Sequence, residues 1–231
     1  MGSLKIFLLL GRTLPPYDRS ECRCGIPNRA LLGPRIVNGM ETEVNEYPWQ
    51  AQTFYFGMRR KWKQMCGGSL ISDSWVLSAA HCVDRHPDPR FHIILLGDHD
   101  LSRSDETNHV WYRVLRIILH PNWSRKYQNF DVTLLKLSRK VNFSKYPHIR
   151  PICLPLHDRD DYAGRIATAT GWGLTSGEGQ FSKKLLEINL KVLSTSECSK
   201  YNEYWVHQQI TYDKFCAHGN GGRTVCSGDS G

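Results

Sequence analysis

Three side chains in this chain have the chemistry to cleave an amide bond together: Ser230, His81 and Asp131. Ser230 stands in Gly228-Asp229-Ser230-Gly231, where small neighbours allow a tight turn and let a substrate carbonyl come close. In such a turn the backbone amides of Gly228 and Ser230 can point at one spot and stabilise an oxyanion. Strings of this composition are usually ordinary turns, so the serine needs a base and an orienting acid to become a nucleophile.

His81 is the candidate base. It follows the strand-like run Trp75–Ser78 in the sequence Ala79-Ala80-His81-Cys82. A single histidine is more often structural than catalytic. Here, however, Cys66 lies sixteen residues before Cys82, and a disulfide between them would fix the histidine where the strand ends.

Asp131 is the candidate acid, in Asn129-Phe130-Asp131 just before the apolar run 132–137. The structural interpretation is a turn residue that starts a strand, and spacing alone favours it. The functional interpretation is a part-buried carboxylate at the mouth of the strand. Such a carboxylate would hold the tautomer of His81.

The elements that must position these residues are mostly strands. Ser194-Thr195-Ser196-Glu197 is a capping-box pattern and predicts one short helix to about Tyr204. Long helical periodicity is otherwise absent. Strand-like patterns cover 51–56, 68–71, 75–78, 91–96, 110–120, 132–137, 165–173 and 184–193.

Composition indicates a secreted globular protein of one or two domains. The 231 residues include eight cysteines and seven tryptophans. A cytosolic metal protein is disfavoured, because there is no Cys-x-x-Cys and no Cys/His cluster at zinc spacing, so we expect no bound metal. The net charge of +8 is spread over scattered lysines and arginines, without a nucleic-acid-binding motif. No apolar run is long enough to span a membrane.

The N-terminal region has two features. Residues 1–10 resemble a signal peptide, but their apolar stretch is shorter than the usual ~7–15 residues, so we interpret it as a degraded or misassembled signal. Residues 11–35 form an irregular leader. At Arg35-Ile36-Val37 a basic residue meets a β-branched pair, which is either a protease cleavage site or an ordinary loop entering a strand.

Taken together, the motifs resemble those of trypsin/chymotrypsin-family serine proteases, in particular extracellular invertebrate-type members. The order His81, Asp131, Ser230 is the chymotrypsin-type order. The resemblance covers residues 36–231. It rests on Arg35-Ile36-Val37-Asn38-Gly39, Tyr47-Pro48-Trp49-Gln50, Cys66-Gly67-Gly68-Ser69-Leu70, Ser78-Ala79-Ala80-His81-Cys82, Asp131-Val132-Thr133-Leu134-Leu135, Gly171-Trp172-Gly173 and 226–231.

The resemblance implies an all-β fold of two antiparallel β-barrels, with the site in the cleft between them. On this basis residues 1–35 are a leader, 36–140 the first barrel, 141–158 a linker and 159–231 the second barrel. The chain ends directly after the serine, where members of the family continue. We therefore expect the second barrel to be incomplete, and the sequence to be a fragment of a longer product or a poorly folding species.

The resemblance also implies activation by cleavage. A cut after Arg35 would free the amine of Ile36 to pair with Asp229, a buried ion pair that needs good hydrogen bonding to persist. The pairing would order the loop around the nucleophile. The disulfides implied are Cys66–Cys82, Cys198–Cys216, and Cys153 with either Cys24 or Cys22, the last of which would keep the leader attached after cleavage.

One departure from the family concerns specificity. Thr224 stands where trypsin-like members carry an aspartate at the base of the pocket. A hydroxyl offers no charge to a lysine or arginine side chain. We therefore expect cleavage after apolar or aromatic residues.

Further expectations concern partners and modification. The sequons at Asn122 and Asn142 predict N-linked glycans. The partners expected are protein or peptide substrates and macromolecular protease inhibitors. The alternative function is a non-catalytic homologue that binds or regulates other proteins. A calcium site is the one cofactor considered, because some relatives bind calcium in the acidic segment that here contains Asp98, Asp100, Asp105 and Glu106, although Asn108 replaces one of their carboxylates.

Overall fold

The computed structural model describes residues 24–28, 40–57, 60–155, 162–174, 179–205, 213–219 and 230. Within them the chain is nearly all β, as the sequence predicts, with a single α-helix and two short 3-10 helices. The elements are β1 (Met40–Glu41), β2 (Gln50–Phe56), β3 (Trp62–Leu70), β4 (Trp75–Ser78), η1 (Ala80–Cys82), η2 (Pro89–Phe91), β5 (His92–Leu96), β6 (Val110–Leu119), β7 (Thr133–Leu137), β8 (Ile166–Gly171), β9 (Leu186–Val192), α1 (Thr195–Trp205) and β10 (Ala217–His218).

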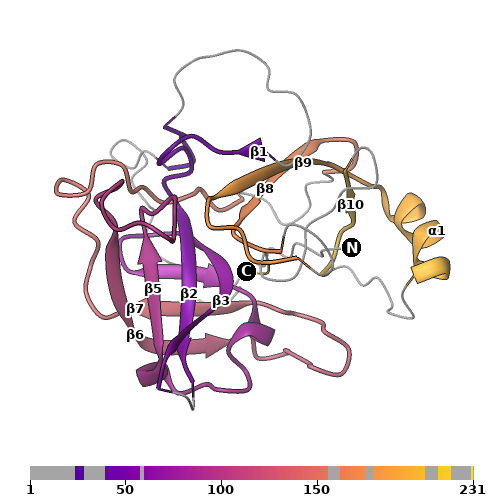
Figure 1. The fold of residues 1–231 in the computed structure, drawn as a ribbon. Helices are drawn as coiled ribbons and strands as arrows, with labels where there is room; N and C mark the ends of the chain where they lie inside the picture. The colour runs from indigo at the N-terminus through magenta and orange to yellow at the C-terminus, as the bar shows by residue number, and fades with distance from the viewer. Residues whose placement is uncertain are drawn as a thin grey trace.

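Six strands close into an antiparallel barrel in the order β2-β3-β4-β7-β6-β5 (Figure 1). The strand expected at 68–71 is wrong at its start, because β3 begins at Trp62. Its first two residues, Trp62 and Lys63, are exposed, so they lack the burial pattern of a core strand. They pair instead with the end of β2 in a long hairpin, in which Phe56 faces Trp62.

Side-chain alternation explains how these strands build a core. In β6, Val110, Tyr112 and Val114 are buried, while Trp111 and Arg113 between them are exposed. Alternation with a period of two is the pattern of a strand with one buried face. The same inward positions of the other strands complete the barrel core, which includes Ala51, Leu70, Val76, Ile94, Leu96, Leu135 and Leu137.

A glycine allows β3 and β4 to approach closely. A Cβ atom at Gly68 would lie 2.9 Å from a methyl carbon of Val76 and 3.0 Å from the carbonyl oxygen of Leu77. Any larger residue would push the two strands apart. This contact matters for function, because β3 carries Cys66 and β4 leads directly to His81.

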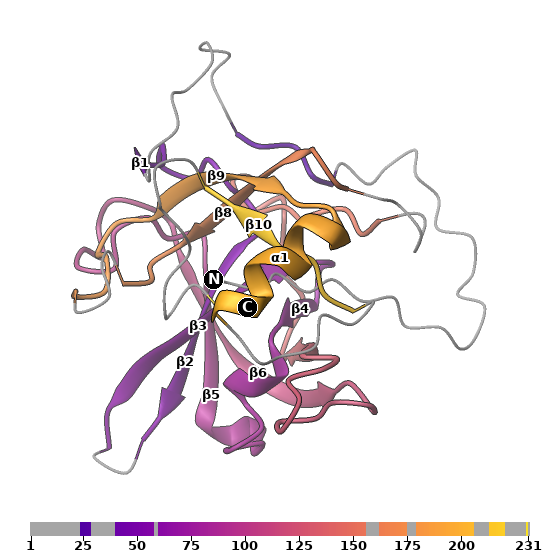
Figure 2. The same ribbon diagram turned by 90° about the vertical axis from the view of Figure 1, so that its right-hand side faces the viewer.

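The remaining strands form a second sheet around β9, which pairs with β1, β8 and β10 (Figure 2). β1 belongs to this sheet although it lies in the range 36–140 assigned above to the first barrel. α1 follows β9 and begins with the reciprocal bonds of a capping box. The Glu197 amide donates to the hydroxyl of Ser194, and the Ser194 amide donates to the carboxylate of Glu197.

The two halves meet around Trp172, which is 1% exposed and packs with Tyr47 and Leu185. Its indole N–H donates to the carbonyl of His99, 2.9 Å away. A second bond joins the Thr170 hydroxyl to the side chain of Gln50 at 2.6 Å. The barrel and the sheet are therefore joined by a packed interface with its own polar contacts.

The described part of the leader, residues 24–28, lies against the linker. Cys24 forms a disulfide with Cys153, and the amide of Gly25 donates to the carbonyl of Pro151. The structure thus selects Cys24 rather than Cys22, which lies outside the described residues. None of the helices in the described residues is long and apolar enough to cross a membrane.

Candidate functional site

His81 lies in a sharp turn at the end of β4. The backbone is extended at Ala79 and then tightens into η1, which places Ala80 and Cys82 in the core and leaves His81 pointing outward. The imidazole is 40% exposed. The disulfide between Cys66 and Cys82 joins η1 to β3 and so fixes the backbone on which the histidine stands.

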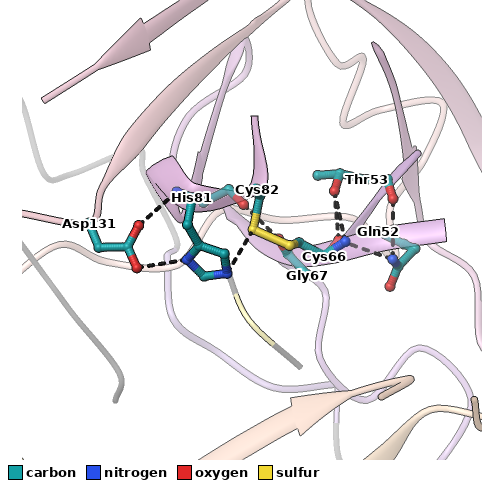
Figure 3. Close-up of a disulfide and its surroundings, with 8 residues drawn as sticks. Gln52, Thr53, Cys66, Gly67, His81, Cys82 and Asp131 are labelled. Carbon is teal, nitrogen blue, oxygen red and sulfur yellow. Dashed lines mark hydrogen bonds and ion pairs between the residues drawn. A yellow bond between two sulfur atoms is a disulfide. The ribbon is translucent and has the colours of Figure 1, made fainter. Parts of the chain in front are cut away.

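Two hydrogen bonds join Asp131 to His81 (Figure 3). One carboxylate oxygen lies 2.7 Å from Nδ1 of His81, and the other accepts the backbone N–H of His81 at 2.8 Å. The carboxylate is only 9% exposed. A carboxylate can only accept at Nδ1, so the proton of the neutral ring lies on Nδ1 and the lone pair on Nε2 is available as a base.

A tight turn presents Asp131. The amide of Val132 donates to the carbonyl of Phe130 at 2.8 Å, and the amide of His120 donates to the carbonyl of Val132 at 3.0 Å. Phe130 has a positive φ of 51°, which is uncommon for a residue that is not glycine. The turn leads at once into β7, so the carboxylate stands at the mouth of a strand.

The backbone of Ser230 lies beside the same disulfide. The amide of Gly67 donates to the carbonyl of Ser230 at 2.7 Å, and Gly67 directly follows Cys66. The structure therefore brings the backbone of Ser230 to the second half of β3, next to the bridge that holds His81. The other predicted site residues lie outside the described residues, namely Arg35, Ile36, Thr224, Gly228 and Asp229.

Two polar residues of β2 support this region, and sequence reasoning missed them. Gln52 and Thr53 are buried, and their side chains donate to the carbonyl of Cys66 at 3.0 and 2.8 Å (Figure 3). The Thr53 hydroxyl also accepts the Cys66 amide at 3.1 Å. They hold the stretch of β3 that bonds to Ser230. The available signal was the polar start of β2, where Gln52 and Thr53 follow Gln50 before the aromatic residues of the strand.

A buried acid holds the loop before Asp131. Asp84 accepts a hydrogen bond from the indole N–H of Trp123 at 3.1 Å and forms an ion pair with Arg125. Its side chain is 7% exposed. Asp84 follows His81 closely in sequence, so it joins the segment of the candidate base to the loop of the candidate acid. No motif in the sequence indicated this contact.

Within the described residues, one group of three potential metal ligands converges: Cys66, His81 and Cys82. The two sulfur atoms are bonded to each other, and Nε2 of His81 lies 3.6 Å from Sγ of Cys82. A disulfide sulfur has no thiolate to offer a metal. The group is therefore structural and brings the imidazole against the bridge.

The carboxylates of the acidic segment are directed toward protein groups. Asp98 is buried, and this burial raises its pKa. Asp100 accepts hydrogen bonds from Ser102, which lower its pKa, and Asp105 pairs with Arg103. Among the described residues these carboxylates form no converging group of three ligands. Calcium binding stays a prediction from the sequence.

Both sequon asparagines are exposed. Asn122 lies in the loop between β6 and β7, and Asn142 lies after β7. The side chain of Asn142 accepts the amide of Lys145 at 3.0 Å, which caps a turn on the surface. Either position leaves room for a glycan, and occupancy stays a prediction.

Removing the bridge between Cys66 and Cys82 should destabilise the protein. The two residues are sixteen apart, and a loop of this size contributes about 3 kcal/mol to the free energy of unfolding. We expect that loss in urea denaturation of a Cys66→Ala/Cys82→Ala variant. The bond between His81 and Asp131 should loosen as well.

A matched control is Cys24→Ala/Cys153→Ala, which opens the bridge between the leader and the linker. It should also lower stability but leave the NMR signals of the His81 ring unchanged. Equal perturbation of the ring in both variants would contradict a local role for the first bridge.

The chain matches a known protein family and is similar to several known proteins. Residues 36–231 match the family model described as Trypsin. The chain is 34% identical over 244 aligned residues to ovochymase-2 of Mus musculus, covering 98% of this chain and 39% of that protein. It is 35% identical over 199 residues to chymotrypsin-like elastase family member 1 of Canis lupus familiaris, covering 85% and 74%.

An insect relative has a similar identity. The serine proteinase stubble of Drosophila melanogaster is 33% identical over 219 residues, which cover 92% of this chain and 27% of that protein. The chain thus spans well under half the length of ovochymase-2 and of stubble.

Proposed function

Because the chain belongs to the trypsin family of serine proteases, we propose that it is a secreted serine endopeptidase, made as a zymogen and acting through Ser230, His81 and Asp131. The observation that supports this most is the pair of hydrogen bonds between His81 and Asp131, in which Nδ1 and a carboxylate oxygen are 2.7 Å apart. It leaves Nε2 as the basic atom of the ring. Ser230 follows in the chain order typical of the family.

The proposed reaction proceeds in two halves. Nε2 of His81 takes the hydroxyl proton of Ser230 as Oγ attacks the peptide carbonyl, and the amides of Gly228 and Ser230 stabilise the oxyanion. The imidazolium then gives its proton to the leaving amine, and the C–N bond breaks to leave an acyl-serine. Water, activated by the same imidazole, hydrolyses this ester and restores Ser230. Asp131 orients the ring and stabilises its cation.

We propose that cleavage after Arg35 activates the protein by freeing the amine of Ile36 to pair with Asp229. The relative named venom serine protease 34 of Apis mellifera supports secretion, as do the three disulfides, which persist in oxidising compartments. In this setting the substrates are proteins or peptides, and macromolecular protease inhibitors are the partners expected at the same site.

A serine-directed fluorophosphonate probe tests the function directly. We expect covalent labelling of Ser230 in the protein cut after Arg35, much weaker labelling of the uncut protein, and none of Ser230→Ala. Absence of labelling in the cut, folded protein would contradict the proposal. That outcome would favour a non-catalytic homologue that binds other proteins.

For specificity, we predict cleavage after apolar or aromatic residues. Burying a cationic side chain without a counter-charge costs several kcal/mol, and Thr224 brings none. The measurement is kcat/KM on peptides that differ only at the residue before the scissile bond. A Thr224→Asp variant should gain activity on lysine and arginine substrates. A wild-type preference for arginine or lysine over phenylalanine, tyrosine and leucine would refute the prediction.

A further inference from the structure

The loop that carries Asp131 has an unusual backbone. Gln128 and Phe130 both have positive φ angles, 50° and 51°, although neither is glycine. Residues with side chains adopt this conformation only where the surroundings enforce it. The ring of His120 stacks on Phe130 at 4.8 Å with an interplanar angle of 7°. That contact holds the phenyl ring, and other groups hold the backbone.

Those groups come from the other half of the chain. A carboxylate oxygen of Asp213 accepts the backbone N–H of Phe130 at 2.7 Å. The ammonium of Lys214 donates to the carbonyl of Tyr127 at 3.1 Å and to the side-chain oxygen of Asn129 at 2.8 Å. Asp213 is only 5% exposed, so its bond is shielded from water.

We propose that Asp213 and Lys214, here called the 213–214 clamp, position the carboxylate of Asp131 for catalysis. The N–H of Phe130 is bonded to Asp213, and the carbonyl of Phe130 is bonded to the amide of Val132. With both polar groups of its backbone held, Phe130 cannot leave the left-handed conformation, and the next residue is Asp131. The direction of the Asp131 side chain therefore depends on Asp213.

The clamp is itself anchored in the second half of the structure. It lies between α1 and β10, three residues or fewer before Cys216. Cys216 is bonded to Cys198 of α1, and its carbonyl accepts the amide of Leu193 at 2.8 Å. The second half thus sets the geometry of an acid that the barrel carries. Asp213 and Lys214 are positioning residues, because they act through Asp131 and have no role in bond breaking.

This inference rests on the proposed function. The test therefore combines a measurement of activity with spectroscopic measurements that can be made on an inactive protein. Asp213→Ala should lower kcat at least about tenfold with little change in KM, because the substrate site is intact while the base is misoriented. Asp213→Asn keeps an oxygen that accepts the Phe130 N–H and should restore most of the activity. Lys214→Ala should have a smaller effect in the same direction.

Two measurements do not depend on catalytic activity. One is the proton NMR signal of the Nδ1 proton of His81, and the other is the hydrogen-exchange rate of the Phe130 amide. Asp213→Ala should shift or broaden the former and accelerate the latter. Asp73→Ala, which removes an ion pair with Lys140 on the surface, serves as a matched control and should change neither. A second variant, Phe130→Asn, tolerates positive φ, so the loss caused by Asp213→Ala should be smaller in its background.

The outcomes separate the two ideas. A wild-type protein without activity, but with a protected Phe130 amide and a His81 signal that responds to Asp213→Ala, would defeat the proposed function and keep the clamp. An active protein in which Asp213→Ala changes neither kcat nor the two signals would overturn the clamp. An equal loss for Asp213→Asn and Asp213→Ala would also overturn it.

Discussion

Changing His81 or Ser230 to alanine should reduce kcat of the activated protein about 10⁶-fold. Without His81 the proposed base is missing, and without Ser230 the proposed nucleophile cannot form the acyl intermediate. A residual rate about 10³–10⁴-fold above that in water should remain, because the oxyanion site and substrate binding do not depend on these two side chains. The measurement is kcat on a chromogenic peptide with protein cut after Arg35.

The double variant sharpens this prediction. Residues that act as one unit are not additive, so His81→Ala/Ser230→Ala should be no slower than either single variant. Urea denaturation should show that all three variants stay folded, because the side chain of His81 is 40% exposed. Retention of about 1% or more of the wild-type kcat by either single variant would contradict the roles assigned here.

Changing Asp131 to asparagine should lower kcat about 10⁴-fold at neutral pH, the size of effect typical when a catalytic histidine is left in the wrong tautomer. In the structure the carboxylate accepts both from Nδ1 and from the backbone N–H of His81. An asparagine amide group turned toward Nδ1 would donate instead of accept. The ring proton would then move to Nε2, which could no longer accept the hydroxyl proton of Ser230.

Nitrogen NMR of the His81 ring gives an independent readout, because the two neutral tautomers have different chemical shifts at Nδ1 and Nε2. We expect the proton on Nδ1 in the wild type and on Nε2 in Asp131→Asn. Asp73→Asn, at a surface ion pair, is the matched control and should alter neither kcat nor the tautomer. A loss below about tenfold in Asp131→Asn would mean that other groups orient the ring.

The sequence predicted the parts of this architecture that depend on local patterns. Alternating side chains located most strands, and the capping box located α1. The predicted start of β3 was wrong because the first residues of the strand belong to an exposed hairpin. Their pairing depends on β2 rather than on burial. The strand alone carries no signal of its partner.

The support of the site could not be predicted in the same way. Asp213 lies 83 residues from Phe130 and bonds to a backbone amide, which every residue except proline possesses. Because the donor is a backbone amide, the type of residue 130 does not show that Asp213 will bond to it. No periodicity links the two segments either. The same holds for Gln52 and Thr53 with the carbonyl of Cys66. Only the folded chain brings such groups together.

The disulfide between Cys24 and Cys153 determines how protein cleaved after Arg35 will migrate on a gel. Cysteine 24 lies before the proposed cut and its partner lies after it, so the two pieces remain one covalent species. On a non-reducing gel the processed and unprocessed forms should migrate almost together, and only a reducing agent should release the shorter fragment. An affinity tag placed ahead of Cys24 would likewise capture both forms, and an apparently homogeneous preparation can contain either.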